Sequence, residues 1–231
     1  MKQLSNPSLQ RLKFILFLAC LAPLARLAAE TYTGDLGADP VETITRSTGI
    51  WTLNLIFATL AITPARKLTG WQWLARFRRM LALFAFFYAC LHFMAYLIFD
   101  QFFDWAGIAL DIGKRPFITV GFICFALLIP LAATSTDSMM RRLGGRRWLR
   151  LHRLAYLIAA AAVFHYLWLV KRDIGAPAAY AVILCLLLCA RIVHVQREPR
   201  KQVVLPSPIP DGQTHAAVLR AAQGKPPRTP G

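Results

Sequence analysis

The sequence is poor in acidic residues and in charge of either sign. Only 11 of its 231 residues are Asp or Glu, and charged residues together make up 16% of the chain. Apolar residues make up 57%, and they gather in several runs long enough to cross a bilayer, which takes roughly 17–25 residues. This composition argues against a water-soluble globular domain and indicates a polytopic membrane protein.

The sequence also lacks any signature of a nucleotide-binding or soluble catalytic domain. It contains no G-x-G-x-x-G motif, and Gly144–Gly145 predicts only a turn. The loops between the apolar runs are at most roughly 20 residues long, well below the size of a small domain. No internal repeat is evident. We therefore expect no nicotinamide- or FAD-binding domain and no substrate chemistry within the chain itself.

Cysteine is scarce and poorly arranged for cross-links or metal binding. All five cysteines lie inside apolar runs and none forms a C-x-x-C pair; they are Cys20, Cys90, Cys124, Cys185 and Cys189. We interpret them as small core or lipid-facing residues rather than as a disulfide framework or a metal site.

Six apolar runs predict an all-α fold, a bundle of six transmembrane helices. They cover about residues 14–29, 49–63, 80–99, 116–133, 146–170 and 177–193. The domain prediction is an N-terminal segment at 1–13, a six-helix transmembrane domain at 14–195 and a disordered tail at 196–231. The first run resembles a signal peptide but offers poor cleavage sites, so a retained helix is expected.

The net charge of +16 fits membrane topology better than nucleic-acid binding, because the basic residues sit in short loops. Most Lys and Arg lie in the N-terminus, in the loops that follow the second and fourth runs, and in the tail. The positive-inside rule places these segments, and both termini, in the cytoplasm. The acidic loops after the first and third runs then face the periplasm or exterior.

Two histidines are predicted to lie at the same depth in the membrane. His92 follows Arg79 by 13 residues and His165 follows Arg150 by 15, which are about 20 and 22 Å of helix. Two imidazoles that face each other across a bundle can clamp one b-type haem iron, and such ligation favours electron transfer over oxygen chemistry. The alternative is an ordinary helix interface whose histidines bond to neighbouring groups. Tyr88, Tyr96 and Trp168, with alanines on the same helices, could supply walls to a haem site.

His152 is a separate candidate site residue. It lies about 3 Å inside the cytoplasmic boundary and on a different stripe from His165. It could ligate a second haem with an unidentified partner, hold a haem propionate or a flavin phosphate, or simply be an interfacial histidine in a basic cluster. No role is assigned to His194 or His215.

Six ordered segments resemble a known family. They are RSTGIW at 46–51, TPARK at 63–67, RRMLALFAFFYACLHF at 78–93, KRPFITVG at 114–121, PLAATST at 130–136 and RRWLRLHRLAY at 146–156. Together they resemble the MsrQ family, the haem-binding membrane subunits of bacterial periplasmic methionine-sulfoxide reductase systems, within the wider ferric-reductase-like transmembrane group. The resemblance covers roughly residues 14–193.

The resemblance implies one or two b-type haems, an FMN requirement and a place in the bacterial inner membrane. His92, His152 and His165 match the family's histidines. The wider group usually carries two histidines on each of two helices, whereas this chain offers three, so the ligation of a second haem stays open. No FMN motif is apparent.

The sequence thus predicts a transmembrane electron-transfer subunit. It would carry electrons from the quinone pool or a cytosolic flavin reductase to a periplasmic molybdenum-containing methionine-sulfoxide reductase that repairs oxidised proteins. One alternative is a ferric or quinone reductase with another acceptor. The other is a proton-coupled transporter that uses the histidines as a relay, although neither paired repeats nor broken midplane helices are evident.

Overall fold

The computed structural model describes residues 6–170 and 174–197, with side chains up to Arg191. The chain divides into two units, Met1–Val193 and His194–Gly231, and the described structure belongs almost entirely to the first. All regular structure in the described residues is helical, which confirms the predicted fold class.

Four helical stretches in the described part are long and apolar enough to cross a membrane. They are Asn6–Thr33 (α1), Pro40–Thr69 (α2), Gln72–Asp100 and Pro116–Ala133 (α5). The third comprises a 3-10 turn, Gln72–Phe77 (η1), then Arg78–Ala95 (α3) and a π-helical turn, Tyr96–Asp100 (η2). The helices Leu154–Leu169 (α8) and Gly175–Arg197 (α9) have shorter apolar lengths. A membrane protein is therefore supported, and the count of six spans stays a prediction.

Three further helices are short: Trp105–Lys114 (α4), Asp137–Leu143 (α6) and Gly145–His152 (α7). Side chains cap the first two, because Asp104 accepts from the Ala106 amide and Thr136 from the Met139 amide. The predicted single helix over 146–170 is interrupted at Arg153. That residue keeps helical backbone angles and bonds the Leu149 carbonyl, so the basic, amphipathic α7 leads directly into the apolar α8.

Several other predicted boundaries differ from the structure. The predicted loop at 30–46 is mostly helical, since α2 begins at Pro40, with Asp39 accepting from the Glu42 amide at its N-cap. Pro64 does not end the second run but lies inside α2, and Gly70, with φ +73°, follows the last residue. Proline is tolerated in membrane helices because neighbouring groups satisfy the freed carbonyl. Pro116 occupies the first turn of α5, as predicted.

The end of the chain was predicted to be a hinge, a last span and a disordered tail. Of the hinge, residues 171–173 lie outside the described part and Gly175 already begins α9. The last helix continues through Gln196 to Arg197, and the remainder of the predicted tail, 198–231, lies outside the described residues.

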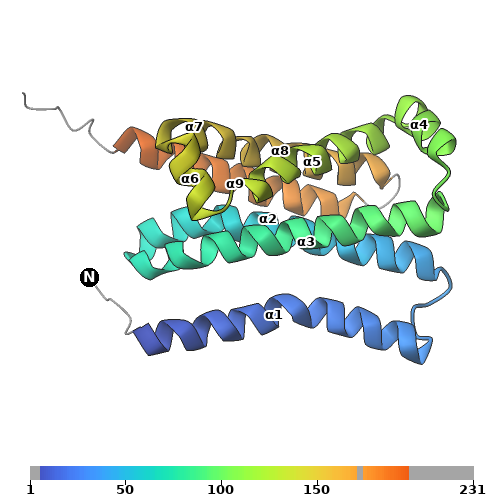
Figure 1. Cartoon of the computed structure of the whole chain (residues 1–231), viewed down its shortest axis with the longest axis horizontal. Coiled ribbons are helices and arrows are strands. Elements are labelled where there is room, and N and C mark those ends of the chain that lie inside the picture. The colour runs from blue at the N-terminus through green and yellow to red at the C-terminus, as the bar shows by residue number, and fades with distance from the viewer. Residues whose placement is uncertain (1–5, 171–173, 198–231) are drawn as a thin grey trace, which may run out of the picture. The chain divides into compact units, whose positions relative to one another are not determined.

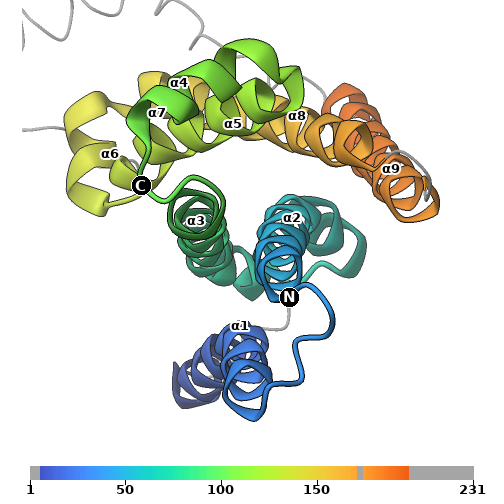
Figure 2. The same cartoon turned by 90° about the vertical axis from the view of Figure 1, so that its right-hand side faces the viewer.

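Four helices form a closed ring, in which each helix packs on two others. α3 contacts α2 and α5, and α8 contacts α5 and α2. Figure 1 shows these helices running alongside one another, and Figure 2 looks along them. The buried apolar residues between them include Leu81, Ala85, Cys124, Ile158 and Ala159. The ring is where a site between helices can form.

α1 and α9 pack on the outside of this ring. The buried Tyr88 of α3 donates to the Cys20 carbonyl and accepts from the Leu24 amide, which ties α1 to α3. Tyr180 of α9 donates to the Asn54 side chain of α2 at 2.8 Å and contacts Phe57 and Tyr166 edge-on. The two outer helices are thus held by tyrosines whose hydroxyl groups find partners inside the bundle.

Candidate functional site

The structure brings His92 and His165 together between α3 and α8. Their ring centroids are 6.3 Å apart and the ring planes are nearly perpendicular, at 82°. A metal–imidazole bond is about 2.0 Å long and the ring centre lies about 1.1 Å beyond the nitrogen, so two axial rings on one iron have centroids about 6 Å apart. The observed separation fits the two axial ligands of a single haem iron.

The hydrogen bonds of the two rings leave the same nitrogen available on each. The Nδ1 of His92 lies 2.9 Å from the Thr45 carbonyl oxygen of α2, and the Nδ1 of His165 lies 2.7 Å from the Phe117 carbonyl oxygen of α5. A carbonyl oxygen only accepts, so each Nδ1 carries the proton and each Nε2 keeps its lone pair. Metal-bound histidines in proteins are commonly held by this kind of bond.

The described residues offer no rival metal site, since no group of three or more His, Cys, Asp or Glu side chains gathers in them. A haem iron needs only two protein ligands because the porphyrin supplies the other four. The donor set of two imidazoles with free Nε2 atoms therefore suits a haem better than a bare cation.

Of the predicted wall residues, some take other roles. The Tyr88 hydroxyl is engaged with α1, and Tyr96 reaches Asp111 at 3.5 Å. Trp168 is exposed and packs edge-on against Phe164. Ala85 and Ala89 are buried on α3, as the prediction of a small-residue face near His92 requires.

His152 is placed apart from this pair, in α7. Its ring stacks on Trp148 with centroids 3.9 Å apart, and its Nδ1 lies 3.2 Å from the Trp148 carbonyl oxygen. Trp148 in turn donates to the Thr134 carbonyl, which fixes the stack against the end of α5. The His152 Nε2 is buried and makes no hydrogen bond of good geometry, although the Leu131 backbone lies close enough to interact with the ring.

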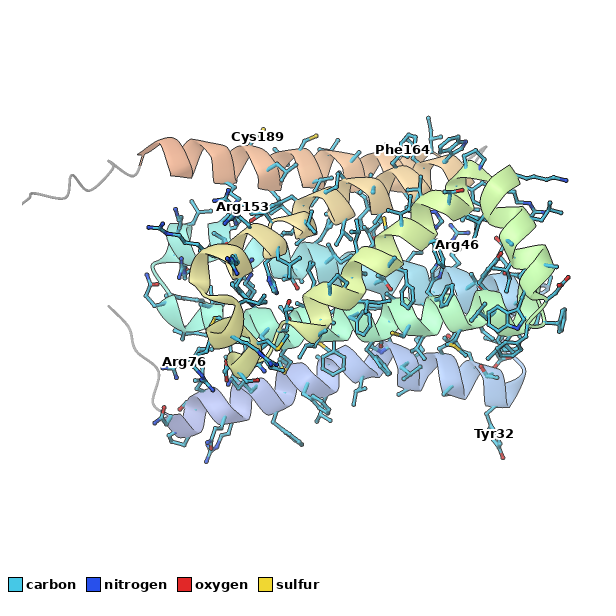
Figure 3. All side chains as sticks on the ribbon, turned by 45° about the horizontal axis from the view of Figure 1, so that its top comes forward. Tyr32, Arg46, Arg76, Arg153, Phe164 and Cys189 are labelled. Carbon is cyan, nitrogen blue, oxygen red and sulfur yellow. The ribbon has the colours of Figure 1, made fainter. Side chains whose placement is uncertain are left out.

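Arginine side chains lie near His152 and near Tyr156, which follows it by four residues. The guanidinium of Arg191 lies over the Tyr156 ring, 4.6 Å from its centroid, and the Tyr156 hydroxyl is buried without a partner. Arg78 of α3 lies close enough to Arg66 and Arg191 for their positive charges to repel its own. Figure 3 shows Arg76 and Arg153 toward one end of the bundle and Tyr32 toward the other.

Sequence reasoning missed two glycines that contact the histidine pair. An ideal Cβ on Gly49 would lie 3.0 Å from the His92 Cε1, and one on Gly121 would lie 2.8 Å from the His165 Cε1. Each is the only glycine of its helix, α2 or α5. A lone glycine inside an apolar span was the available signal, since glycine weakens a helix interior without giving a side chain to pack.

These features define a class: a helical membrane protein with a histidine pair inside a four-helix ring. Residues 47–163 match the family described as ferric reductase like transmembrane component. The match contains His92 and His152 and stops two residues before His165.

The comparison with individual proteins is more specific. The chain is 55% identical to a protein of Herminiimonas arsenicoxydans over 203 residues, covering 87% of this chain and 93% of the relative. It is 52% identical over 188 residues to one from Rhodospirillum rubrum (81% and 90% covered) and 47% identical over 187 to one from Caulobacter vibrioides (81% and 89% covered). All three are named protein-methionine-sulfoxide reductase heme-binding subunit MsrQ. The chain belongs to this MsrQ family, which confirms the resemblance found in its sequence.

Proposed function

We propose that this chain is a haem-binding electron-transfer subunit, with His92 and His165 as the axial ligands of one b-type haem. The observation that carries the proposal is the pair of rings 6.3 Å apart, each with its Nδ1 bonded to a backbone carbonyl. The family membership supports it, because the relatives are named as haem-binding subunits.

The residues of this chain would supply binding, orientation and exclusion of water. The Thr45 and Phe117 carbonyls would hold the proton on each Nδ1 and leave each Nε2 with its lone pair for the iron. The haem supplies reversible one-electron chemistry at its iron. A haem iron held by both histidines would have no open site for oxygen, which would favour electron relay over reaction with oxygen.

We propose His152 as the ligand of a second haem or as a contact to an anionic group of a cofactor. Its support is the buried Nε2, the buried Tyr156 hydroxyl without a partner four residues further along the chain, and the arginines near these two residues. FMN remains an expectation from the family resemblance. No residue is assigned to it.

We further propose a location in the bacterial inner membrane, with six spans and both termini in the cytoplasm. The basic loops support this orientation. Electrons would then enter from the quinone pool or a cytosolic flavin reductase at the His152 end. They would leave at the other end to a methionine-sulfoxide reductase, the partner that the relatives' name suggests. That this partner is periplasmic and contains molybdenum is what the family resemblance implies.

The test uses membranes that contain the chain and a reductant supplied at the cytoplasmic face. The haem should become reduced and stay reduced, and the catalytic partner alone should reoxidise it only to a limited extent. Partner together with methionine sulfoxide should reoxidise it continuously, and the His165→Ala variant should not sustain this turnover.

Two outcomes would redirect the proposal. Reduced haem that ignores partner and sulfoxide but is reoxidised by ferric chelates would make the chain a ferric reductase. A purified chain without haem absorbance would leave the transporter alternative in its place.

A further inference from the structure

We propose that Gly49 and Gly121 are positioning residues for the two iron-ligating imidazoles. Because each glycine lacks a side chain, one ring can pack closely against its helix. The inference rests on the proposed haem function and goes beyond it, because it assigns a role to two residues on helices that carry no ligand. Gly49 lies on α2 and serves His92, and Gly121 lies on α5 and serves His165.

A Cβ at either glycine would crowd the imidazole ring, so that the ring would have to shift. A Cβ at Gly49 would lie 3.0 Å from Cε1 and 3.1 Å from Nδ1 of His92. A Cβ at Gly121 would lie 2.8 Å from Cε1 and 3.1 Å from Nδ1 of His165. Carbon atoms in van der Waals contact sit about 3.5–4.0 Å apart, so a Cβ at either position would overlap the ring.

The same arrangement occurs at both histidines. His92 bonds the Thr45 carbonyl, four residues before Gly49, and His165 bonds the Phe117 carbonyl, four residues before Gly121. Residues four apart lie one above the other on a helix face, so carbonyl and glycine form one surface under the ring. The carbonyl fixes the Nδ1 end of the ring and the glycine fixes its depth. Two independent helix pairs thus use one solution, which packing by chance would not be expected to repeat.

If the glycines position the imidazoles, a methyl group added at either glycine should act through the histidine ring that it touches. Without iron, a histidine can swing away from an added methyl group. A ring held at once by the carbonyl and by the iron has no such freedom. Adding a methyl group should therefore weaken haem binding and disturb the ligand field far more than it disturbs the folded chain.

The experiment compares Gly49→Ala and Gly121→Ala with Gly113→Ala, purified from membranes as the full chain. Gly113 is a helical glycine of α4, and an ideal Cβ at this position would meet no neighbouring heavy atom within 4 Å. Its change to alanine adds the same methyl group without a contact to a histidine. The readouts are haem per protein, the low-spin absorbance spectrum, the reduction potential and the effect of added imidazole.

We expect Gly121→Ala to weaken haem affinity about tenfold or more, the size typical of losing a group that orients a metal ligand. Gly49→Ala, whose contact is longer, should have a smaller effect in the same direction. The haem that remains should lose low-spin character, and imidazole should restore it by replacing the displaced ring. Gly113→Ala should match the unsubstituted chain in every readout. Full haem content with unshifted spectra in both Gly49→Ala and Gly121→Ala would overturn the inference.

A second cycle separates positioning of the ring from ordinary helix packing. In a His165→Ala background the ring is gone, so adding Gly121→Ala should leave the yield and the thermal unfolding of the chain unchanged. If Gly121→Ala lowers stability equally with and without the ring, the glycine serves helix packing and the inference is wrong. This cycle also decides the case in which Gly121→Ala alone accumulates poorly.

Failure of the haem proposal gives a different pattern. In that case the unsubstituted chain binds no haem, or His92→Ala and His165→Ala keep its full spectrum. If those two variants lose the haem while both alanine-for-glycine variants retain it, only the role of the glycines is rejected.

Discussion

The two histidine regions of this chain differ in what the imidazoles already touch. At His92 and His165, each Nδ1 is bonded to a carbonyl of another helix and each ring lies on a glycine. At His152 the ring stacks on Trp148 of its own helix, and its Nδ1 faces the carbonyl of that same residue. Each ring of the pair is therefore held directly by another helix, whereas His152 is held through Trp148, which itself donates to the Thr134 carbonyl at the end of α5.

The difference suggests different tolerances for change. An imidazole that is hydrogen-bonded to a neighbouring helix keeps its position only while the four-helix ring is intact. That bond also fixes the orientation of the imidazole as a ligand. His152 is held mainly through a residue of its own helix, and its buried Nε2 makes no hydrogen bond of good geometry, with the Leu131 backbone nearby. An unsatisfied buried polar atom is costly, so the His152 region is the one that an additional ligand would complete.

The largest expected effect is the loss of low-spin haem when either member of the pair is removed. His92→Ala and His165→Ala should each abolish or severely reduce the low-spin b-type bands, because one imidazole cannot maintain six-coordinate iron. The measurement is an absorbance spectrum before and after dithionite, with membrane insertion checked by protein yield. Full, unshifted spectra in both variants would reject the pair as the ligands.

The second expected effect is all-or-none and concerns which end of the bundle is cytoplasmic. A reporter active only in the periplasm should be silent when fused after Gly231 and active when inserted near Gly107, because the basic segments stay inside. The reverse pattern would exchange the roles of the two histidine regions as entry and exit points for electrons.

Some of this comparison was predictable from sequence and some was not. The closeness of His92 and His165 followed from the fixed helical rise, since 13 and 15 residues from the basic boundaries give nearly equal depth. The break at Arg153 was not predicted, because nothing in the local sequence demands it and the residue keeps helical backbone angles. The backbone contacts of the two rings were also missed, since Thr45 and Phe117 contribute carbonyl oxygens, which every residue carries.

Boundary errors have a common physical origin. Pro64 and the acidic loop after the first span were interpreted with rules from soluble proteins, in which proline and charge end helices. In the structure α2 continues past Pro64, and Asp39 with Pro40 starts a helix instead of marking a loop. The backbone N–H and C=O groups of a membrane helix must be hydrogen-bonded within the protein, so such a helix continues through a proline or a charged residue that would end a helix in water.

A smaller effect is expected from His152→Ala. The low-spin bands of the pair should persist, because neither ring of the pair is hydrogen-bonded to His152. Electron entry from a cytoplasmic donor should slow by roughly 10–100-fold, the loss typical of a group that holds or orients a cofactor. Stopped-flow reduction of the haem measures this rate. A loss of the pair's own spectrum would show that the two regions are one site.

The smallest expected effects compare two tyrosines, one with partners and one without. Tyr88→Phe removes a buried hydroxyl that donates to the Cys20 carbonyl and accepts from the Leu24 amide. It should cost about 1–2 kcal/mol, because two backbone groups lose a partner. Tyr156→Phe removes a buried hydroxyl that has no partner, so the unfolding midpoint of the chain should not fall.

Thermal unfolding of the detergent-solubilised chain measures both effects, and Tyr32→Phe is the control because that side chain is 93% exposed. The informative variant is Tyr156→Phe when the chain is isolated with its cofactors. A lower midpoint in the loaded chain, with none in the chain stripped of cofactor, would mean that a bound group supplies the missing partner beside His152. An equal loss in both forms would instead mean that the hydroxyl finds a protein partner, and the contrast between the two histidine regions would then weaken.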